Sequence, residues 1–210
     1  MKYPSFEIVE IQEEQLNESV NILARAFEND PTTRYLFSEH AAPIKDAVWE
    51  LYLYICERQL NQRLPILGAV SDSRLVGVAC IQPPDTNSQP NQEPSQYEMR
   101  FGDFIGEQVM QRMIEYGQVT SAHLPNESHV YLTAVGVHPD EQGKGYGRAL
   151  LDAVHKLSDT HPTSMGVSLD TGNAVNVPMY EHFGYNMVAK TKLEELDLWC
   201  MFRSNRKRSA

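Results

Sequence analysis

Gln142-Gly143-Lys144-Gly145-Tyr146-Gly147 is the stretch that decides the fold of this chain. An apolar run at residues 129–137 precedes it and a run with helical periodicity at residues 148–157 follows it, so the order is strand, glycine-rich turn and helix. Glycine allows a tight turn with positive φ, and the first turn of a helix presents unpaired N–H groups and the positive end of its dipole. The stretch therefore predicts a binding site for a phosphate or pyrophosphate group.

The spacing of the glycines excludes two common phosphate sites. A P-loop requires Gly-x4-Gly-Lys-Ser/Thr, whereas Lys144 stands between two glycines with no Ser or Thr behind it. A dinucleotide fingerprint requires Gly-x-Gly-x-x-Gly, and no third glycine stands at position 148 or 150. The remaining pattern is Gln-x-x-Gly-x-Gly, read at Gln142, Gly145 and Gly147.

This pattern resembles the acyl-CoA pyrophosphate loop of the GCN5-related N-acetyltransferases, the GNAT superfamily. A second match lies downstream and resembles the branch of that superfamily that includes puromycin N-acetyltransferase. The chain departs from that branch at Asp170, where Glu is usual, and at Tyr185, where Phe is usual. The residues that carry this second match are Leu169, Thr171, Asn176, Pro178, Tyr180 and Gly184.

The resemblance implies an α/β (α+β) fold of the GNAT type. Such a fold has a mixed, mainly antiparallel sheet of six or seven strands flanked by helices, with a V-shaped splay between the two central strands. We expect residues 1–203 to form a single GNAT-like acyltransferase domain, with a polar linker at about 83–96, and residues 204–210 to form a frayed basic tail.

Apolar periodicity and turn residues place the other elements of the chain. The expected helices are residues 13–29, ended by Pro31, then 42–60, and 97–116, where Gly102 and Gly106 weaken the pattern. The expected strands are residues 6–11, a hairpin at 66–70 and 75–81, a buried strand at 165–170, and a terminal hairpin at 185–190 and 196–202.

The resemblance also implies that the cofactor is acetyl-CoA. The backbone groups of Val135 and Val137 would pair with its pantetheine arm, while Gly136 between them permits a β-bulge. Either Asn173 or Asn176 would contact the cofactor, and the sequence leaves both open. The implied cofactor-binding residues are Val135, Gly136, Val137, Gln142, Gly143, Lys144, Gly145, Tyr146, Gly147, Arg148, Asn173 and Asn176.

The implied reaction is direct acetyl transfer to an amine in a ternary complex. Tyr180 is the candidate catalytic residue, because a phenol with a pKa of about 10 can protonate a leaving thiolate. A strand N–H near Ala134 or Val135 would stabilise the oxyanion. The general base is not identified, since Tyr131 and Thr133 occupy the inward-facing places on the motif strand.

The acceptor pocket should lie outside the cofactor motif. We expect Phe27, Asp30 and Tyr35 to bind the substrate, together with the helix at residues 97–113, because aromatic rings can pack an apolar body while a carboxylate holds a cation. The leading hypothesis is a primary amine of a small molecule as acceptor. A protein lysine or N-terminal acetyltransferase and a non-catalytic acyl-CoA sensor are the alternatives, and Tyr180 favours an enzyme over the sensor.

The composition of the 210-residue chain is that of an ordinary globular protein, with 41% hydrophobic and 22% charged residues. The net charge of −10 argues against nucleic-acid binding. No apolar run or signal peptide indicates a membrane partner, and three scattered cysteines indicate reduced thiols, neither disulfides nor a metal site. We therefore expect a cytoplasmic enzyme, and whether it forms a homodimer stays open.

Overall fold

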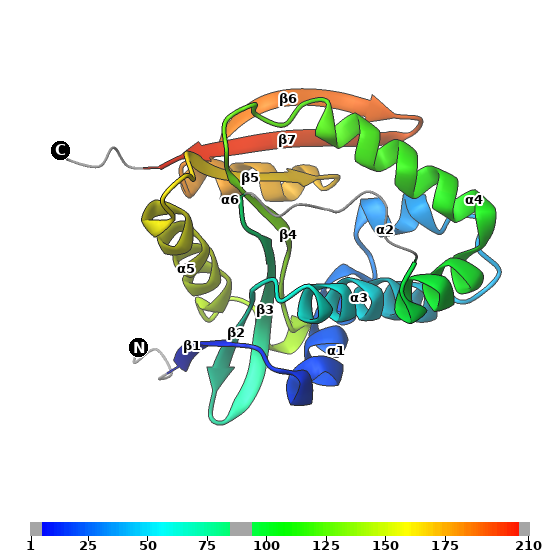
Figure 1. The fold of residues 1–210 in the computed structure, drawn as a ribbon, viewed down its shortest axis with the longest axis horizontal. Helices are drawn as coiled ribbons and strands as arrows, with labels where there is room; N and C mark the ends of the chain where they lie inside the picture. The colour runs from blue at the N-terminus through cyan, green and yellow to red at the C-terminus, as the bar shows by residue number, and fades with distance from the viewer. Residues whose placement is uncertain (1–5, 85–93, 206–210) are drawn as a thin grey trace.

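The computed structural model describes residues 6–84 and 94–205, and its seven strands form a single mixed sheet in the order β1-β2-β3-β4-β5-β7-β6 (Figure 1). The strands are β1 (Phe6–Glu10), β2 (Ile66–Ser71), β3 (Arg74–Gln82), β4 (Val130–Val137), β5 (Gly166–Thr171), β6 (Asn186–Leu193) and β7 (Leu196–Ser204). The helices are α1 (Leu16–Phe27), α2 (Pro31–Leu36), α3 (Ile44–Asn61), α4 (Gln96–Ser121), α5 (Tyr146–Thr160) and α6 (Val177–His182), with 3-10 turns at Glu13–Gln15, Pro139–Glu141 and Ala174–Asn176.

The two central strands pair only at their first residues. β4 and β5 are parallel, and their register is Val130 with Val167 and Tyr131 with Ser168, after which the strands part. All other neighbouring strands are antiparallel. In Figure 1, β3 and β4 run across the direction of β5, β7 and β6, so the splay is visible. The expected fold class, with its seven strands and its V-shaped opening, is confirmed.

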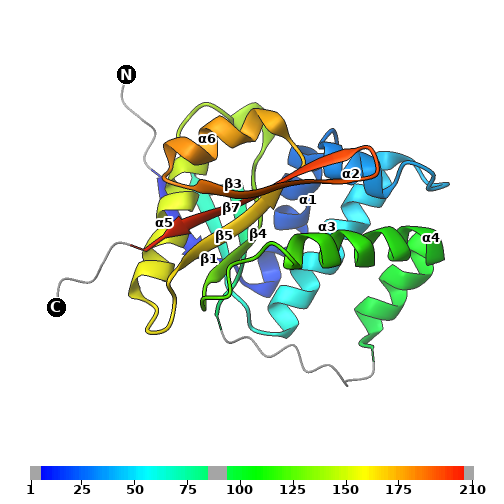
Figure 2. The same cartoon turned by 90° about the horizontal axis from the view of Figure 1, so that it is seen from above.

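Helices cover both faces of the sheet (Figure 2). On one face α1 packs on β3, β4 and α3, because its apolar residues recur at helical spacing; Val20, Leu23 and Ala24 are buried there. On the other face α5 packs on β2 to β5 through Leu150, Leu151 and other apolar residues. The two cores are thus separate clusters divided by the sheet.

A β-bulge at Thr133 changes which side chains of β4 point to each face of the sheet. Cys80 of β3 lies opposite Ala134 and Ile81 lies opposite Leu132, so Thr133 is an additional residue on β4. As a result Leu132 packs in the α5 core, whereas Ala134 packs in the α1 core. Gly136, where the sequence would permit a bulge, pairs regularly with β3 instead.

The role of Gly136 is instead close packing. A Cβ there would lie 3.0 Å from Ala26 Cβ and 3.3 Å from a ring carbon of Phe27. Only a residue without a side chain lets the end of α1 approach β4 this closely. Gly136 therefore sets how near Phe27 and the loop that follows it come to the central strand.

The segment after α1 differs from the expectation, because Pro31 begins a helix as well as lying beyond the end of one. Asp30 is the N-cap of α2, and its Oδ1 accepts a hydrogen bond of 2.9 Å from Thr32 N. Pro31 occupies the first helical position, where its missing N–H costs nothing. An Asp-Pro pair is a stronger helix-start signal than a stop signal, so α1 and α2 form two short helices joined at Asp30.

The long helix α4 contains one break. Gly106 has φ 72° and ψ 176°, so two helical pieces meet there, as the glycines in the sequence indicated. The break directs the second piece toward β4 and β5, which brings Met113 and Tyr116 over the splay.

The expected linker at 83–96 falls mostly on residues 85–93, which lie outside the described residues, and Ser95 already caps α4. The expected frayed tail included residues 204 and 205, which the structure places at and just after the end of β7, whereas residues 206–210 lie outside the described residues. Ser204 ends β7, and Asn205 Nδ2 donates to the carbonyl groups of Ser158 and Ser164.

Cys56, Cys80 and Cys200 are free and buried. Within 6–84 and 94–205, no helix is long and apolar enough to cross a membrane.

Candidate active site

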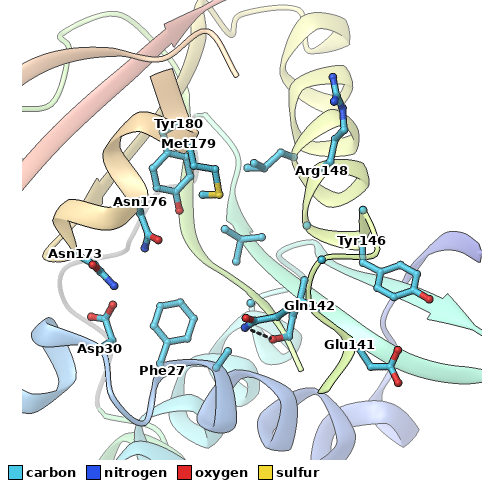
Figure 3. A pocket seen from close by; sticks show the side chains of 18 of the residues that line it. Phe27, Asp30, Glu141, Gln142, Tyr146, Arg148, Asn173, Asn176, Met179 and Tyr180 are labelled. Carbon is cyan, nitrogen blue, oxygen red and sulfur yellow. Dashed lines mark hydrogen bonds between the residues drawn. The ribbon is translucent and has the colours of Figure 1, made fainter. Parts of the chain in front are cut away.

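A cleft of about 630 Å³, which we call the loop cleft, lies beside the glycine-rich turn (Figure 3). It lies between the end of α1, the second half of β4, the start of α5 and helix α6. Its lining residues are Ala26, Phe27, Asn29, Asp30, Val135, Gly136, Val137, Glu141, Gln142, Gly143, Gly145, Tyr146, Gly147, Arg148, Leu151, Asn173, Asn176, Met179, Tyr180 and Phe183.

The turn before α5 has the geometry of an anion cradle. Gly143 and Gly145 have φ of 78° and 94°, a region that only glycine adopts without strain. The first hydrogen bond of the helix runs from Ala149 N to Gly145 O, so the N–H groups of the preceding residues have no partner within the helix. A Cβ at either glycine would meet no described atom within 4 Å, which leaves room for a ligand. The turn fits a pyrophosphate group.

Two side-chain contacts stabilise the turn. Gln142 Nε2 donates to Val137 O at 3.3 Å (Figure 3). Lys144 Nζ lies 2.7 Å from Glu141 Oε2, and this contact raises the pKa of Lys144. Lys144 is the one predicted cofactor-binding residue that is not among the described lining residues of the loop cleft. Its ammonium group is paired with Glu141, which does line the cleft.

The edge of β4 that faces β5 is open along the loop cleft. From Leu132 to Val137, β4 has no pairing with β5 among the described residues. The side chains of Val135 and Val137 pack toward the α5 core. Since β5 does not pair with this part of β4, the backbone groups of the edge are free to pair with a ligand. This free edge and the turn together fit an extended group that ends in a pyrophosphate.

Tyr180 lies where β4 and β5 part. Its ring is 7% exposed and packs edge-on against Tyr185, with 5.7 Å between ring centroids. Burial raises the pKa of Tyr180, and the carboxylates of Asp170 and Asp30 raise it further, so the phenol keeps its proton. In Figure 3 its hydroxyl points into the space between Asn176 and Phe27.

Both candidate asparagines line the loop cleft. Asn173 accepts a hydrogen bond of 3.1 Å from Val175 N, so part of its amide already serves the local turn. Asn176 precedes α6 and lines a second cavity as well. The structure thus brings both residues to the cleft, and Asn176 alone reaches the boundary between the two spaces.

The second cavity, which we call the inner cavity, has a volume of about 220 Å³ and lies under α4 in the mouth of the splay. It shares Phe27, Asp30, Val135, Asn176 and Tyr180 with the loop cleft. Its other lining residues are Thr32, Thr33, Leu36, Leu51, Tyr52, Ile55, Met113, Tyr116, Tyr131, Leu132, Thr133, Ala134, Leu169, Asp170, Thr171 and Gly172.

Asp170 is the polar centre of the inner cavity. Tyr131 Oη donates to one carboxylate oxygen and Tyr116 Oη donates to the other. Burial raises the pKa of Asp170 and the charge of Asp30 adds to the rise, while the two phenols lower it. Burial also raises the pKa of Tyr116 and of Tyr131. The phenols therefore remain donors and the carboxyl group remains the acceptor.

The predicted substrate-binding residues separate into two groups. Phe27 and Asp30 line both cavities, and burial raises the pKa of Asp30 although Thr32 and Thr33 donate to it. Tyr35 is not among the described lining residues of either cavity, and Arg112 lies over its ring at 5.7 Å. The face of α2 that carries Tyr35 turns toward α4, so its ring serves the packing of the two helices.

Sequence reasoning missed the Asp170 cluster. Tyr131 was noted as inward-facing and Asp170 as a departure from the family pattern, yet nothing in the sequence paired them with Tyr116. The signal was present in part, because Asp170 is the one charged residue in the strand Gly166–Thr171. The partner on α4 depends on the break at Gly106, which periodicity alone does not orient.

Solved structures with the same fold come from distant sequences. One is the histone acetyltransferase HPA2 and related acetyltransferase of Corynebacterium glutamicum, with a TM-score of 0.73, 19% identity, and coverage of 98% of this chain and 99% of that one. Another is the PaiA N-acetyltransferase of Thermoplasma acidophilum in complex with coenzyme A, with a TM-score of 0.57, 16% identity, and coverage of 95% and 99%. At these identities the likeness shows the fold.

A closer sequence match is local. An uncharacterized N-acetyltransferase of Schizosaccharomyces pombe is 40% identical over 55 residues, which are 26% of this chain and 22% of that protein. This chain thus matches less than a quarter of the length of that relative.

The profile of the Acetyltransferase (GNAT) family matches residues 29–185, about three quarters of the chain. That range contains the glycine-rich turn, the splay and the described lining residues of both cavities other than Ala26 and Phe27. The family transfers acetyl groups from acetyl-CoA, and one of the similar structures is a coenzyme A complex. The chain belongs to the GNAT acetyltransferase family.

Proposed function

We propose that the protein is an acetyl-CoA-dependent N-acetyltransferase that acts on a primary amine of a small molecule. The observation that carries this proposal is the junction of the two cavities. The loop cleft suits an extended ligand with a pyrophosphate, the inner cavity is a separate compact space, and five residues line both. A donor in one and an acceptor in the other would meet at that junction.

The fit of acetyl-CoA rests on features of this chain. The N–H groups at the start of α5 and the two glycines with positive φ would hold the pyrophosphate. The free edge of β4 at Val135 and Val137 would pair with the pantetheine arm. When bound, acetyl-CoA supplies an acetyl thioester.

Three tasks fall to residues at the junction. A backbone N–H of β4 near Ala134 or Val135 stabilises the charge that develops on the carbonyl oxygen. Tyr180, whose phenol keeps its proton, donates to the departing sulfur. Asp30 holds the incoming ammonium group before it loses its proton, since its carboxyl group lines both cavities at the junction.

The enclosed acceptor space supports a small molecule over a folded protein. The inner cavity is smaller than the ~300–1,000 Å³ of pockets that take drug-sized ligands. The segment Asn176-Val-Pro-Met-Tyr180, which resembles the puromycin N-acetyltransferase branch, borders this space. We include membership of this branch in the proposal.

The experiment is a screen of acceptors with purified protein and acetyl-CoA. Release of free CoA thiol is followed with a panel of small amines, lysine peptides and peptides with a free N-terminus, and products are identified by mass spectrometry. Acetylated small amines support the proposal. Acetylation of peptides alone favours a protein acetyltransferase, and cofactor binding without transfer to any acceptor favours a sensor.

A further inference from the structure

The inner cavity contains two carboxylates and no basic side chain. Asp30 lies at its junction with the loop cleft, and Asp170 lies deeper, between β5 and α4. Among the described lining residues of this cavity there is no Lys, Arg or His. The cavity is therefore negatively charged, and nothing in its described wall compensates it.

Asp170 in particular has hydrogen bonds but no counter-charge. Its described partners are the hydroxyl groups of Tyr116 and Tyr131, and no ion pair to it is found in the described part of the chain. Buried carboxylates in proteins are normally paired with a cation. Two phenols stabilise the carboxylate without neutralising it, so a cation in the cavity would complete the site.

The two phenols also fix the position of the carboxylate. Tyr116 comes from α4 and Tyr131 from β4, so the carboxyl group is held from a helix and a strand. Each carboxylate oxygen keeps a further acceptor position, and Asp170 lines the inner cavity. This arrangement pre-organises an ammonium site on the wall opposite the junction.

Asp30 and Asp170 occupy different places along the same space. Asp30 lines both cavities, whereas Asp170 lines only the inner one. The wall between them is largely apolar and includes Phe27, Met113 and Ile55. A molecule that satisfies both carboxylates therefore has two cationic ends and a short hydrocarbon middle.

We propose that the acceptor is a compact diamine, whose far ammonium group binds Asp170 while its near amino group reacts at the junction beside Asp30. This inference rests on the proposed function and adds the acceptor class. The near nitrogen forms the N–C bond with the acetyl carbonyl and the C–S bond breaks. The ammonium group releases two protons; one passes to the sulfur by way of Tyr180, and the other passes to solvent. The far nitrogen keeps its proton and its charge.

The test compares three acceptors that differ only at the far end: diaminobutane, butylamine and aminobutanol. Their affinity is measured by calorimetry on the CoA-saturated protein, and turnover is followed by CoA thiol release. Diaminobutane should bind and react better than the other two. Asp170→Asn should remove that preference, with a loss of about tenfold or more for the diamine, since a charge-assisted hydrogen bond is lost. Butylamine should bind the variant as it binds the wild type.

Two further variants separate charge from folding. Tyr116→Phe keeps the Asp170 carboxylate but removes one of the two phenols that fix it, so it should weaken the diamine preference without removing it. Asp103→Asn removes one negative charge from an exposed position on α4 outside both cavities and should change nothing. Cofactor affinity should be unchanged in all three variants, which reports an intact loop cleft.

The outcomes distinguish this inference from the proposed function. Equal use of butylamine and diaminobutane, or a preference that survives Asp170→Asn, overturns the diamine inference and leaves the amine acetyltransferase standing. Diamine binding that depends on Asp170 without any acetylation supports the ammonium site and overturns the proposed function. Absence of both binding and acetylation overturns both.

Discussion

Tyr131 of β4 donates its phenolic proton to Asp170 of β5 at the point where the two strands stop pairing. The backbone register ends at Tyr131 and Ser168, and this side-chain hydrogen bond is the next link between the strands. The Tyr131–Asp170 pair therefore forms the closed end of the splay, and both side chains line the inner cavity.

Gly145→Val should abolish binding of acetyl-CoA. Valine has a branched Cβ that would occupy the open space above the turn, and its φ of 94° is strained for any L side chain. Calorimetry with CoA measures the loss. Gly106→Val is the matched control, because Gly106 also has positive φ and open space but lies in α4, away from the loop cleft. Unchanged CoA affinity in folded Gly145→Val contradicts the phosphate site.

Tyr180→Phe should keep cofactor affinity and slow turnover. The change removes one hydroxyl group and leaves the ring contact with Tyr185. General acid assistance is worth typically ~10²–10⁴-fold, so kcat should fall by a factor within that range. Steady-state kinetics with a saturating acceptor measures it. Tyr97→Phe is the matched control, because it removes a phenol on α4 that is not among the described lining residues of either cavity, and a Tyr180→Phe variant with wild-type kcat would show that the ring only packs.

Asp30→Asn should raise the KM of the amine acceptor without changing acetyl-CoA affinity. Asn is as good an N-cap as Asp, so the cap of α2 survives while the negative charge is lost. Phe27→Ala should act in the same direction through lost packing. The KM for the amine and the Kd for CoA are measured side by side. If the amine KM is spared in both variants, the acceptor does not lie at the junction.

Asp170→Asn should raise the melting temperature at neutral pH. The pKa of Asp170 is raised in the folded protein, so the folded state binds more protons than the unfolded chain above the ordinary pKa of 3.8. Stability therefore falls as pH rises from that value through the raised pKa, and a neutral amide avoids this loss. Calorimetric scans at neutral pH measure the shift. A lower melting temperature would show that the carboxylate serves the fold.

His155 should make stability pH-dependent on the acid side. Burial lowers its pKa from 6.5 to about 4, so the unfolded chain binds more protons between these values. Stability is complete above about pH 6.5 and is lost as pH falls toward 4.

Denaturant unfolding across that range compares the wild type with His155→Gln. The glutamine retains a hydrogen-bonding group near Tyr185 Oη but does not titrate, so its profile should be flatter. His123→Gln, at an exposed position, should follow the wild type. Parallel profiles for the wild type and His155→Gln exclude His155 as the titrating group.

The sequence predicted most elements because their signals are local. Residues 142–147 fixed a strand, turn and helix, and the apolar spacing of α1, α3 and α5 matches their buried faces. Pro31 was misinterpreted because the same residue both follows one helix and begins another. Thr133 as the site of the bulge was not predictable, since a bulge depends on the register with β3 and leaves no local pattern.

The candidate site likewise has one part that the sequence predicted and one part that it did not. The turn and Tyr180 lie in motifs with fixed spacing, so the sequence placed them near the loop cleft. The inner cavity is assembled from α2, α3, α4, β4 and β5, and its centre joins Tyr116 to a residue 54 positions away. Only tertiary packing determines such a contact, and Tyr35 was wrongly oriented for the same reason.

The extra residue at Thr133 makes β4 a strand of two independent halves. Before Thr133 the odd-numbered residue Tyr131 faces α4, and after it the even-numbered residue Ala134 faces α1. Removing Thr133 would make Leu132 and Ala134 direct neighbours, and since they already face opposite sides of the sheet, both halves of β4 would keep their facing in a regular ladder. Thr133 itself is exposed and lines the inner cavity. A deletion at this one position would therefore alter the wall of the inner cavity and leave the described lining of the loop cleft unchanged.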